Sequence, residues 1–265
     1  MMISKKETDT LNHGCYLGKE VAERWARKQY VMAEEKAFLG DFGRDIQGAK
    51  ILDIGIGGGR STRFLLPLAS EYVGIDYSPD MVDAAAASFP GTRIEVGDAR
   101  NLSAFQDGEF DFVMFSFNGI DCLAHEGRMQ TLNEVFRVLK PGGLLGFSSH
   151  NRQQPVAKPY SLKYLYRSKH PVRMWRFFLL YLEGIRAWKK SAGSAMACEE
   201  YELRHDSGNT FTAPHYYISK PSLVAQVEPL GFDLLAIYDT AGKKVTAEER
   251  DETSSWFHYA FRKHS

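Results

Sequence analysis

Three alternating glycines and an acidic residue have the spacing of a turn that binds a nucleotide. Gly55, Gly57 and Gly59 directly follow a short apolar run that contains Asp53, and the segment 60–68 after them has helical spacing. Glycine lets the main chain touch a ligand with no side chain between them. A strand, a tight turn and a helix start form the opening of a nucleotide-binding βαβ unit.

The spacing of the glycines excludes two common nucleotide sites. A dinucleotide fingerprint that starts at Gly55 requires its third glycine where Arg60 stands. The Lys-Ser/Thr pair of a phosphate-binding loop is absent as well. A carboxylate at Asp53 would repel a pyrophosphate, so it suits a cationic ligand.

A second acid, Asp76, ends the next predicted strand, 21 residues after Gly55. An acid at this place in a doubly wound fold can accept hydrogen bonds from both ribose hydroxyls. Ser78 and Pro79 follow as a helix start, with a capping residue and then proline at the first helical position.

Further landmarks occur in a fixed order along the chain. After 53–59 and Asp76 come Gly97-Asp98-Ala99, a buried strand at 111–117, and the sequence LKPGG at 139–143 before another apolar strand. This order resembles that of class I S-adenosylmethionine-dependent methyltransferases. The resemblance covers about residues 45–150 by specific motifs and 219–265 by pattern only, and it implies S-adenosylmethionine as the cofactor.

The resemblance also implies which residues bind that cofactor. Met81 would pack against the adenine, Asp98 would accept from the adenine amino group, and the amide of Ala99 would donate to the ring. The full set of expected cofactor-binding residues is Asp53, Gly55, Gly57, Gly59, Asp76, Tyr77, Met81, Asp98, Ala99, Ser116 and Asn118.

The fold class expected from the pattern is α/β. Strands and helices alternate from residue 50 to 149, which predicts a parallel sheet with helices on both faces. The resemblance implies a Rossmann-like, seven-stranded, mostly parallel sheet whose last strand, at 256–262, is antiparallel. Ligands of such sheets bind at the carboxyl ends of the strands.

Four segments are expected: an N-terminal helical cap (1–45), a cofactor-binding core (46–151), a lid or acceptor-binding insertion (152–218) and the C-terminal part of the core sheet (219–265). Helices are predicted within 17–39, followed by a turn-rich link from 40 to 48. Tyr16 and Tyr30 either face the ligand or pack onto the sheet.

The insertion differs from the rest in composition. Between Arg152 and Lys190 there are ten Lys or Arg residues and one acid, with interleaved aromatics that include Tyr160, Tyr164 and Tyr166. The pattern predicts a short helix, a longer helix over 171–190, and a β-hairpin over 200–218 with a glycine turn. The segment 160–190 is either a lid over the acceptor, a basic amphipathic helix on an anionic membrane surface, or a packing or dimer interface. Single-stranded nucleic acid ranks last.

Candidate catalytic residues follow the predicted strands. His150 ends strand five and is the first candidate for a general base, or it bonds a loop. His215 and Tyr216 are a second candidate pair. Asp121, after strand four, either contacts a ligand or caps a helix, and His125 is expected at a surface helix start.

Composition and absent motifs narrow the function. The net charge is zero and the three cysteines, Cys15, Cys122 and Cys198, are scattered, so neither a nucleic-acid footprint nor a metal cluster is expected. We expect a cytoplasmic protein and metal-independent transfer. Ser116-Phe117-Asn118-Gly119 replaces the motif of nucleobase methylation, which favours a small-molecule or a lipid- or sugar-linked acceptor. The alternative is a non-catalytic cofactor-binding or scaffold protein. The acceptor and the oligomeric state stay open.

Overall fold

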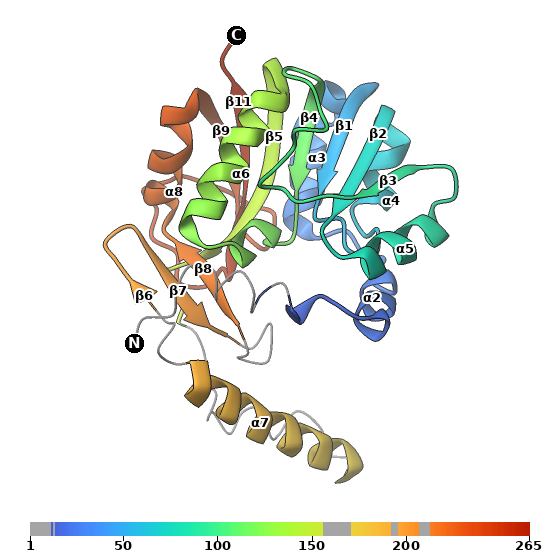
Figure 1. The fold of residues 1–265 in the computed structure, drawn as a ribbon. Helices are drawn as coiled ribbons and strands as arrows, with labels where there is room; N and C mark the ends of the chain where they lie inside the picture. The colour runs from blue at the N-terminus through green and yellow to red at the C-terminus, as the bar shows by residue number, and fades with distance from the viewer. Residues whose placement is uncertain (1–11, 13, 156–170, 192–195, 207–212) are drawn as a thin grey trace.

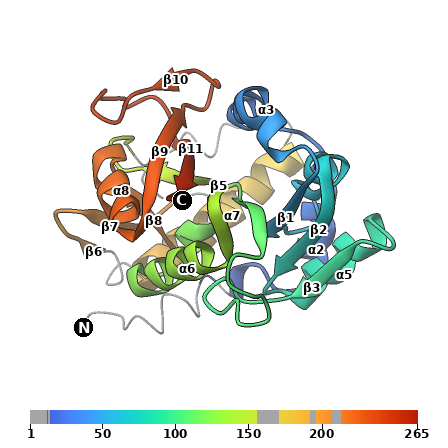
Figure 2. The same ribbon diagram turned by 90° about the horizontal axis from the view of Figure 1, so that it is seen from above.

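A twisted sheet with helices on both faces forms the body of the protein (Figures 1 and 2). The computed structural model describes residues 12, 14–155, 171–191, 196–206 and 213–265. The first five strands along the chain run parallel to one another. They are β1 (Ala49–Ile54), β2 (Ala69–Asp76), β3 (Arg93–Val96), β4 (Phe110–Phe115) and β5 (Leu139–Asn151). Strands β1 and β4 are buried along almost their whole length, as expected of parallel strands covered on both faces.

Three C-terminal strands extend this sheet beyond β5. They are β9 (Phe232–Tyr238), β10 (Lys244–Val245) and β11 (Trp256–Lys263), and the order across the sheet is β10-β9-β11-β5-β4-β1-β2-β3. Strand β11 runs antiparallel to both β5 and β9. The predicted antiparallel last strand is therefore confirmed.

The predicted hairpin in the insertion is also confirmed, but it belongs to the main sheet. Strand β7 (Tyr201–His205) pairs antiparallel with β8 (Pro214–Ile218), and β6 (Met196–Ala197) pairs with β7. Strand β8 pairs in parallel with the end of β5. The sheet has eleven strands among the residues that the structure describes, so the expected count of seven was too low. The expected turn at 207–209 lies outside those residues.

Helices flank the sheet on both sides, and Figure 2 shows α3 and α6 on opposite faces. The α-helices are α2 (Lys19–Ala26), α3 (Ala33–Ile46), α4 (Thr62–Leu65), α5 (Pro79–Ser88), α6 (His125–Val138), α7 (Pro171–Ser191) and α8 (Lys220–Val227). Short 3-10 turns are η1 (Leu66–Leu68), η2 (Gly119–Cys122) and η5 (Glu228–Leu230).

Helix α3 corrects one expectation of the sequence. The predicted turn-rich link from residue 40 onward is helical to Ile46. Phe38, Phe42 and Ile46 recur at a spacing of four and pack into the core between α3 and the sheet. Burial of this apolar stripe outweighs the low helix propensity of Gly40 and Gly43.

Helix α7 begins at Pro171 as predicted and lies beyond the edge of the sheet at which the hairpin attaches (Figure 1). The predicted short helix before it, with Tyr160, Tyr164 and Tyr166, falls in 156–170, outside the described residues. None of the helices described is both long and apolar enough to cross a bilayer.

Candidate active site

A pocket opens at the carboxyl ends of β1, β2 and β4, where the sequence places the ligand. Its lining residues are Asn12, Tyr16, Trp25, Ile54, Gly55, Gly57, Asp76, Tyr77, Met81, Gly97, Asp98, Ala99, Arg100, Phe115, Ser116, Phe117, Gly119, Cys122 and Leu123. Gly55 and Gly57 have φ values of +65° and +55°, which L side chains rarely adopt. The glycine turn therefore has the tight backbone that the sequence predicts.

Asp76 is fixed at the pocket wall by two main-chain donors. Its Oδ2 accepts from the amide of Gly57 and its Oδ1 accepts from the amide of Ser78, each at 2.9 Å. These bonds connect the glycine turn to the N-terminus of α5, for which Ser78 is the N-cap. The carboxylate is thereby held where β2 ends.

The wall beyond Asp76 comes from two adjacent segments. Met81 is buried on α5, and Tyr77 lies beside it on the lining. Asp98 and Ala99 follow β3, and the carboxylate of Asp98 accepts from the guanidinium of Arg100 at 2.6 Å. The structure brings together these four predicted cofactor-binding residues along one wall.

Asp53 and Gly59 were expected at the ligand, but neither lines the pocket. Asp53 is completely buried and accepts from the hydroxyl of Tyr72 at 2.7 Å. This burial raises the pKa of Asp53 to about 7. A Cβ on Gly59 would lie 2.6 Å from the ring of Phe89, and its φ is +87°. Both residues therefore support the glycine turn from its buried side and do not face the pocket.

Ser116 lines the pocket, but its hydroxyl is engaged in a buried ion pair. It donates to Glu35 and accepts from Arg60, whose two terminal nitrogens reach Glu35 at 2.7 and 2.6 Å. Burial would raise the pKa of Glu35, but Arg60 outweighs burial and lowers it. The arginine that breaks the dinucleotide fingerprint thus anchors α3 to the pocket.

The two tyrosines that were expected either at the ligand or on the sheet differ in position. Tyr30 is 47% exposed and does not line the pocket, whereas Tyr16 does.

Aromatic rings close one end of the pocket. Trp25 lies with its ring centroid 5.9 Å from that of Tyr16 and 5.6 Å from that of Phe117. The ammonium of Lys28 sits 3.4 Å from the Trp25 centroid, and burial together with the charge of Arg60 lowers the pKa of Lys28 to about 8. Sequence reasoning missed both Trp25 and Phe117. An aromatic residue on a helical stripe, such as Trp25, or in an apolar strand run, such as Phe117, is usually part of the core.

The chain is unusual just after β4. Phe117 and Asn118 have φ values of +56° and +59°, the left-handed region that non-glycine residues adopt infrequently. The amide of Asn118 donates to the hydroxyl of Ser148 at 2.8 Å, which holds this turn against β5. The side-chain oxygen of Asn118 is buried and has no hydrogen-bond partner among the described residues.

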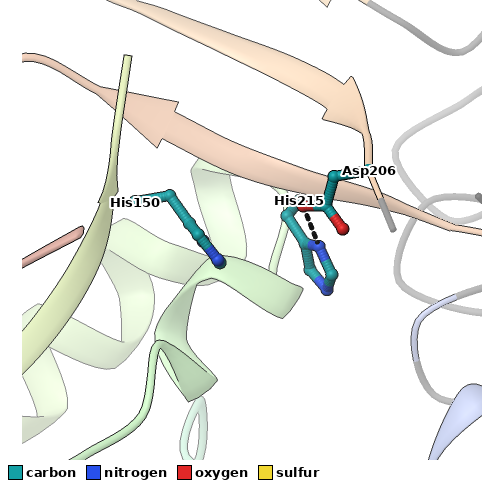
Figure 3. A group of neighbouring side chains, drawn as sticks. All are labelled: His150, Asp206 and His215. Atoms are coloured by element: carbon teal, nitrogen blue, oxygen red, sulfur yellow. Dashed lines mark hydrogen bonds and ion pairs between the residues drawn. The ribbon is translucent and has the colours of Figure 1, made fainter. Parts of the chain in front are cut away.

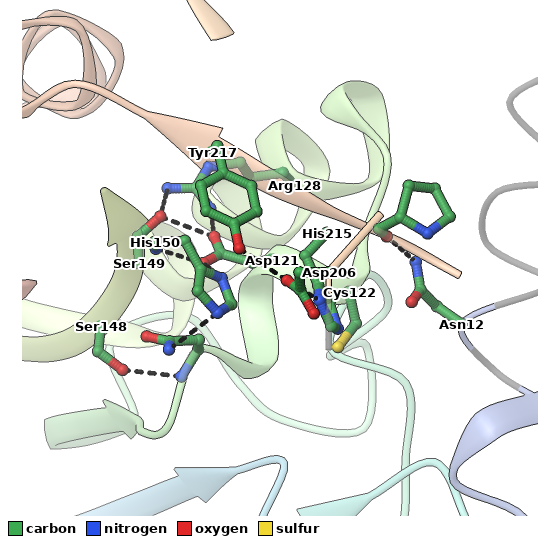
Figure 4. Close-up of polar contacts among 12 residues, drawn as sticks. Asn12, Asp121, Cys122, Arg128, Ser148, Ser149, His150, Asp206, His215 and Tyr217 are labelled. Atoms are coloured by element: carbon green, nitrogen blue, oxygen red, sulfur yellow. Dashed lines mark hydrogen bonds and ion pairs between the residues drawn. The ribbon is translucent and has the colours of Figure 1, made fainter. Parts of the chain in front are cut away.

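His150 is oriented by a buried carboxylate (Figure 4). Its Nδ1 lies 2.7 Å from Oδ2 of Asp121, and its amide donates to the same oxygen at 2.6 Å. A carboxylate only accepts, so Nδ1 carries a hydrogen, and in the neutral imidazole Nε2 then carries the lone pair. Nε2 lies 3.3 Å from Nδ2 of Asn118, which donates to it. His150 is therefore held in the tautomer that a general base needs.

Asp121 is itself held by further buried donors. Nη1 of Arg128 donates to Oδ1 at 2.6 Å, and the hydroxyl of Ser149 donates to Oδ1 at 2.7 Å. Burial would raise the pKa of Asp121, but the bond with His150 and the charge of Arg128 outweigh it and hold the pKa below its usual value. Neither Asp121 nor His150 lines the pocket, and Asp121 contacts both the amide and Nδ1 of His150.

A second histidine lies beside the first. The ring of His215, on β8, has its centroid 5.3 Å from that of His150, and the ring of Tyr217 lies 4.9 Å from His150. Nδ1 of His215 and the hydroxyl of Tyr217 both contact Oδ2 of Asp206 at 2.7 Å. Burial would lower the pKa of His215, but Asp206 raises it well above its usual value. His215 also bonds Cys122, which lines the pocket.

Tyr216, the third predicted catalytic residue, does not line the pocket and faces away from His215. Strand alternation places it on the face opposite His215 and Tyr217. It is fully buried, and its hydroxyl contacts Nδ1 of His125 and Nε2 of Gln226, each at 2.9 Å. His125 starts α6 as predicted, but it is half-buried and stacks on Tyr201 rather than facing solvent.

Comparison with known proteins agrees with this geometry. Residues 51–143 match a methyltransferase domain family. A ubiquinone biosynthesis O-methyltransferase of Xanthomonas oryzae is 31% identical over 113 residues, which are 41% of this chain and 46% of that protein. A phthiotriol/phenolphthiotriol dimycocerosates methyltransferase of Mycobacterium leprae is 36% identical over 110 residues, 39% of this chain and 38% of that protein. The matched stretch thus spans less than half the length of either relative.

The fold has solved counterparts as well. The structure of a 1,6-didemethyltoxoflavin-N1-methyltransferase of Burkholderia thailandensis, solved with S-adenosylhomocysteine, superimposes with a TM-score of 0.61. It covers all of this chain and 92% of that one at 12% identity. The similarity of fold therefore extends beyond residues 51–143, which match the domain family.

Proposed function

We propose that this chain, which belongs to the class I S-adenosylmethionine-dependent methyltransferases and uses S-adenosylmethionine as its cofactor, methylates an oxygen atom of its acceptor. The observation that carries this proposal is the pair of His150 and Asp121 beside the pocket. A hydroxyl must lose its proton to become a strong nucleophile, and a neutral imidazole can take that proton. A neutral amine or a carboxylate needs little activation of this kind.

The residues of the pocket fit the cofactor. Asp76 would accept from the ribose hydroxyls, while Met81 and Asp98 would receive the adenine. The buried, unpartnered oxygen of Asn118 can accept from an amine or hydroxyl brought to the end of β4. When bound, the cofactor supplies a methyl group on a positively charged sulfonium.

The protein's own part is alignment, water exclusion and proton uptake. Asn118 and Asp121 hold His150 from both ring nitrogens, so Nε2 has a fixed direction. The negative charge of Asp121 would stabilise the imidazolium that forms after proton uptake. Trp25 and Phe117 keep water from one end of the pocket, which suits a reaction in which charge is lost.

The test separates cofactor binding from proton uptake. S-adenosylhomocysteine release is followed with S-adenosylmethionine and a panel of phenols, alcohols, amines, and lipid- and sugar-linked acceptors. For the best hydroxyl acceptor, His150→Gln should lower kcat about 10²- to 10⁴-fold and leave S-adenosylhomocysteine affinity within about three-fold. His264→Gln, at an exposed histidine paired with Asp233, is the matched control.

Two outcomes would count against oxygen methylation. If only amines are methylated, and His150→Gln changes kcat less than about ten-fold, the acceptor atom is nitrogen. If S-adenosylhomocysteine does not bind, the non-catalytic alternative takes precedence. The name of the Xanthomonas relative specifies O-methylation, which supports the oxygen acceptor without extending to its identity.

The acceptor group is either part of a soluble molecule or linked to a lipid. The exposed face of α7 favours a lipid-linked acceptor. Large apolar side chains are exposed there, with Val172 at 65% and Trp175 at 62%. Among the side chains of α7 that the structure describes, the exposed large apolar ones are Val172, Met174, Trp175, Phe178 and Leu179. They fall within about 160° of the helix circumference at 100° per residue, as in helices that lie on membranes.

Liposome co-sedimentation tests the lipid acceptor. Trp175→Ser with Phe178→Ser should lower binding to anionic vesicles about ten-fold or more, because each buried aromatic side chain contributes about 1.5–3 kcal/mol. Leu235→Ser, at an exposed apolar residue on β9, is the matched control. If the wild type and both variants bind the vesicles equally, α7 is interpreted as a lid, and soluble acceptors are then tested before lipid-linked ones.

A further inference from the structure

Two histidines and an aspartate from three elements converge beside the pocket (Figure 3). His150 ends β5, Asp206 directly follows β7, and His215 lies on β8. One ligand-type atom from each lies within 4.8 Å of the others. These residues are far apart in the sequence, which is why their spacing shows no metal motif. The fold brings them together because β8 pairs with β5.

We propose that His150, Asp206 and His215 form a binding site for a divalent transition-metal ion, with Zn²⁺ as the first candidate. Two imidazole nitrogens and one carboxylate oxygen are a donor set that proteins use for Zn²⁺ and Fe²⁺. Such sites keep at least one coordination position open. That position would face an acceptor, because Cys122 connects His215 to the lining of the pocket.

The surroundings of the cluster resemble the support that metal ligands receive in proteins. A histidine ligand usually donates its other ring N–H to a carboxylate, and a carboxylate ligand is usually hydrogen-bonded in turn. Asp121 accepts from Nδ1 of His150, so Nε2 would bind the cation in place of the hydrogen that Asn118 donates to it. The hydroxyl of Tyr217 donates to Asp206 at 2.7 Å. Two of the three proposed ligands thus have this outer support.

The distances require a modest contraction on binding. In a tetrahedral site with bonds of about 2.1 Å, ligand atoms lie about 3.4 Å apart. The three ligand-type atoms lie within 4.8 Å of one another, so the pair that is farthest apart has to approach by up to about 1.4 Å, which a movement of His150 can supply. Its side chain is 16% exposed, whereas that of His215 is 5% exposed, so His150 is the less confined of the two.

This site goes beyond the proposed function, in which His150 takes up a proton. Both roles need the same tautomer, with hydrogen on Nδ1 and a lone pair on Nε2. In the metal-bound protein, an acceptor hydroxyl would bind the cation, its pKa would fall, and its proton would pass to water. The site would then activate the same class of acceptor by coordination.

The experiment measures metal binding without any acceptor. The full chain is stripped with EDTA, dialysed, and titrated with Zn²⁺ by calorimetry and with Co²⁺ by visible absorption. We expect one Zn²⁺ per chain and Co²⁺ absorption bands typical of nitrogen and oxygen ligands. His215→Ala and Asp206→Asn should each weaken Zn²⁺ binding at least about ten- to 100-fold, the scale for disturbing a metal site.

A matched pair elsewhere on the protein controls for weak surface binding. His264 and Asp233 lie 3.1 Å apart on the exposed surface, so His264→Ala and Asp233→Asn should leave Zn²⁺ affinity unchanged. S-adenosylhomocysteine titration of each variant reports the cofactor site and the folded state independently of the metal. If His215→Ala does not fold, NMR of the wild type serves instead, since bound Co²⁺ shifts the imidazole N–H resonances of its ligands. Absence of stoichiometric Zn²⁺ uptake, or equal affinity in His215→Ala and His264→Ala, overturns the proposal.

Discussion

The cofactor side and the histidine side of the pocket are built in opposite ways. On the cofactor side, the glycine turn supplies main-chain groups, and Asp76 is held by two amides from its own βαβ unit. On the histidine side, Asp121, Arg128, His150 and His215 are charged or titratable groups of different elements, joined in a network (Figure 4). One side is local and mostly main chain, whereas the other is long-range and mostly side chain.

This difference predicts how each side responds to substitution. A site built mostly from main-chain groups loses affinity when a carboxylate such as Asp76 is removed, while the fold around it persists. A buried charged network loses stability when one partner is removed, because the remaining charge is left without compensation in a poorly polarisable interior. Stability and function should therefore be coupled on the histidine side and separable on the cofactor side.

The largest effect is expected for Arg128→Gln. Arg128 is fully buried, pairs with Asp121 at 2.6 Å, and lies 4.6 Å from the ring centroid of Tyr216. Its loss leaves the Asp121 carboxylate buried without its cation, so the free energy of unfolding should fall by about 3–5 kcal/mol. Urea denaturation followed by circular dichroism measures this change.

An exposed ion pair provides the control for Arg128. Arg250 and Glu252 are 2.5 Å apart but largely exposed, so Arg250→Gln should cost less than about 1 kcal/mol. Similar losses of unfolding free energy in the two variants would show that the buried Arg128–Asp121 pair stabilises the fold no more than an exposed pair does. The proposed coupling of stability and function on the histidine side would then be wrong.

Asp53→Asn tests a buried charge on the cofactor side through its pH dependence. Burial raises the pKa of Asp53 from 3.8 to about 7, so the folded state binds the proton more tightly than the unfolded state between these values. The stabilising contribution of Asp53 is thus full below about pH 4 and is lost as pH rises through about 7. The unfolding free energy of wild type minus that of the variant should fall by up to about 1.4 kcal/mol per pH unit in this range. A flat difference curve would contradict the raised pKa.

The same contrast explains what the sequence could predict. Asp76 was predicted from its place at the end of a strand, whereas Met81, Asp98 and Ala99 were predicted from the family resemblance. The structure places all four on the lining of the pocket. Asp53 was placed at the ligand by the same pattern, but strand alternation directs it into the core against Tyr72. Local spacing therefore located the glycine turn at the pocket, but it did not predict that the side chain of Asp53 points into the core.

The histidine network lay beyond the reach of local patterns. His150 was proposed from its place at a strand end, and His215 was proposed separately from its place in the hairpin that leads back into the core. Their mutual contact depends on β8 pairing with β5, and Asp206 received no role because the hairpin was expected in a lid. Asp121 was assigned to a ligand or a helix cap, since nothing in its neighbourhood indicates a partner at residue 150. Pairing between distant strands is the information that a single sequence lacks.

Asp76→Ala should separate affinity from stability on the cofactor side. The substitution removes the acceptor expected for the ribose and leaves the amides of Gly57 and Ser78 without their carboxylate. S-adenosylhomocysteine affinity should fall by about 1–3 kcal/mol, the scale for leaving buried hydrogen-bond partners unpaired. Calorimetric titration measures this loss. Unchanged affinity would count against the ribose assignment.

The smallest effect concerns the aromatic end of the pocket, where a lysine meets a cationic ligand. Lys28 lies over Trp25 and has a pKa lowered to about 8, so it loses its charge as pH rises from 7 to 9. Its charge repels the sulfonium of S-adenosylmethionine but not the neutral thioether of S-adenosylhomocysteine. The ratio of the two Kd values, S-adenosylmethionine over S-adenosylhomocysteine, should therefore fall about two- to five-fold over this range, or roughly 0.5–1 kcal/mol. Lys28→Met should abolish this pH dependence, whereas Lys19→Met, at the first residue of α2, should preserve it. If the ratio stays constant in the wild type, the sulfonium binds away from Trp25, and the aromatic end belongs to the acceptor.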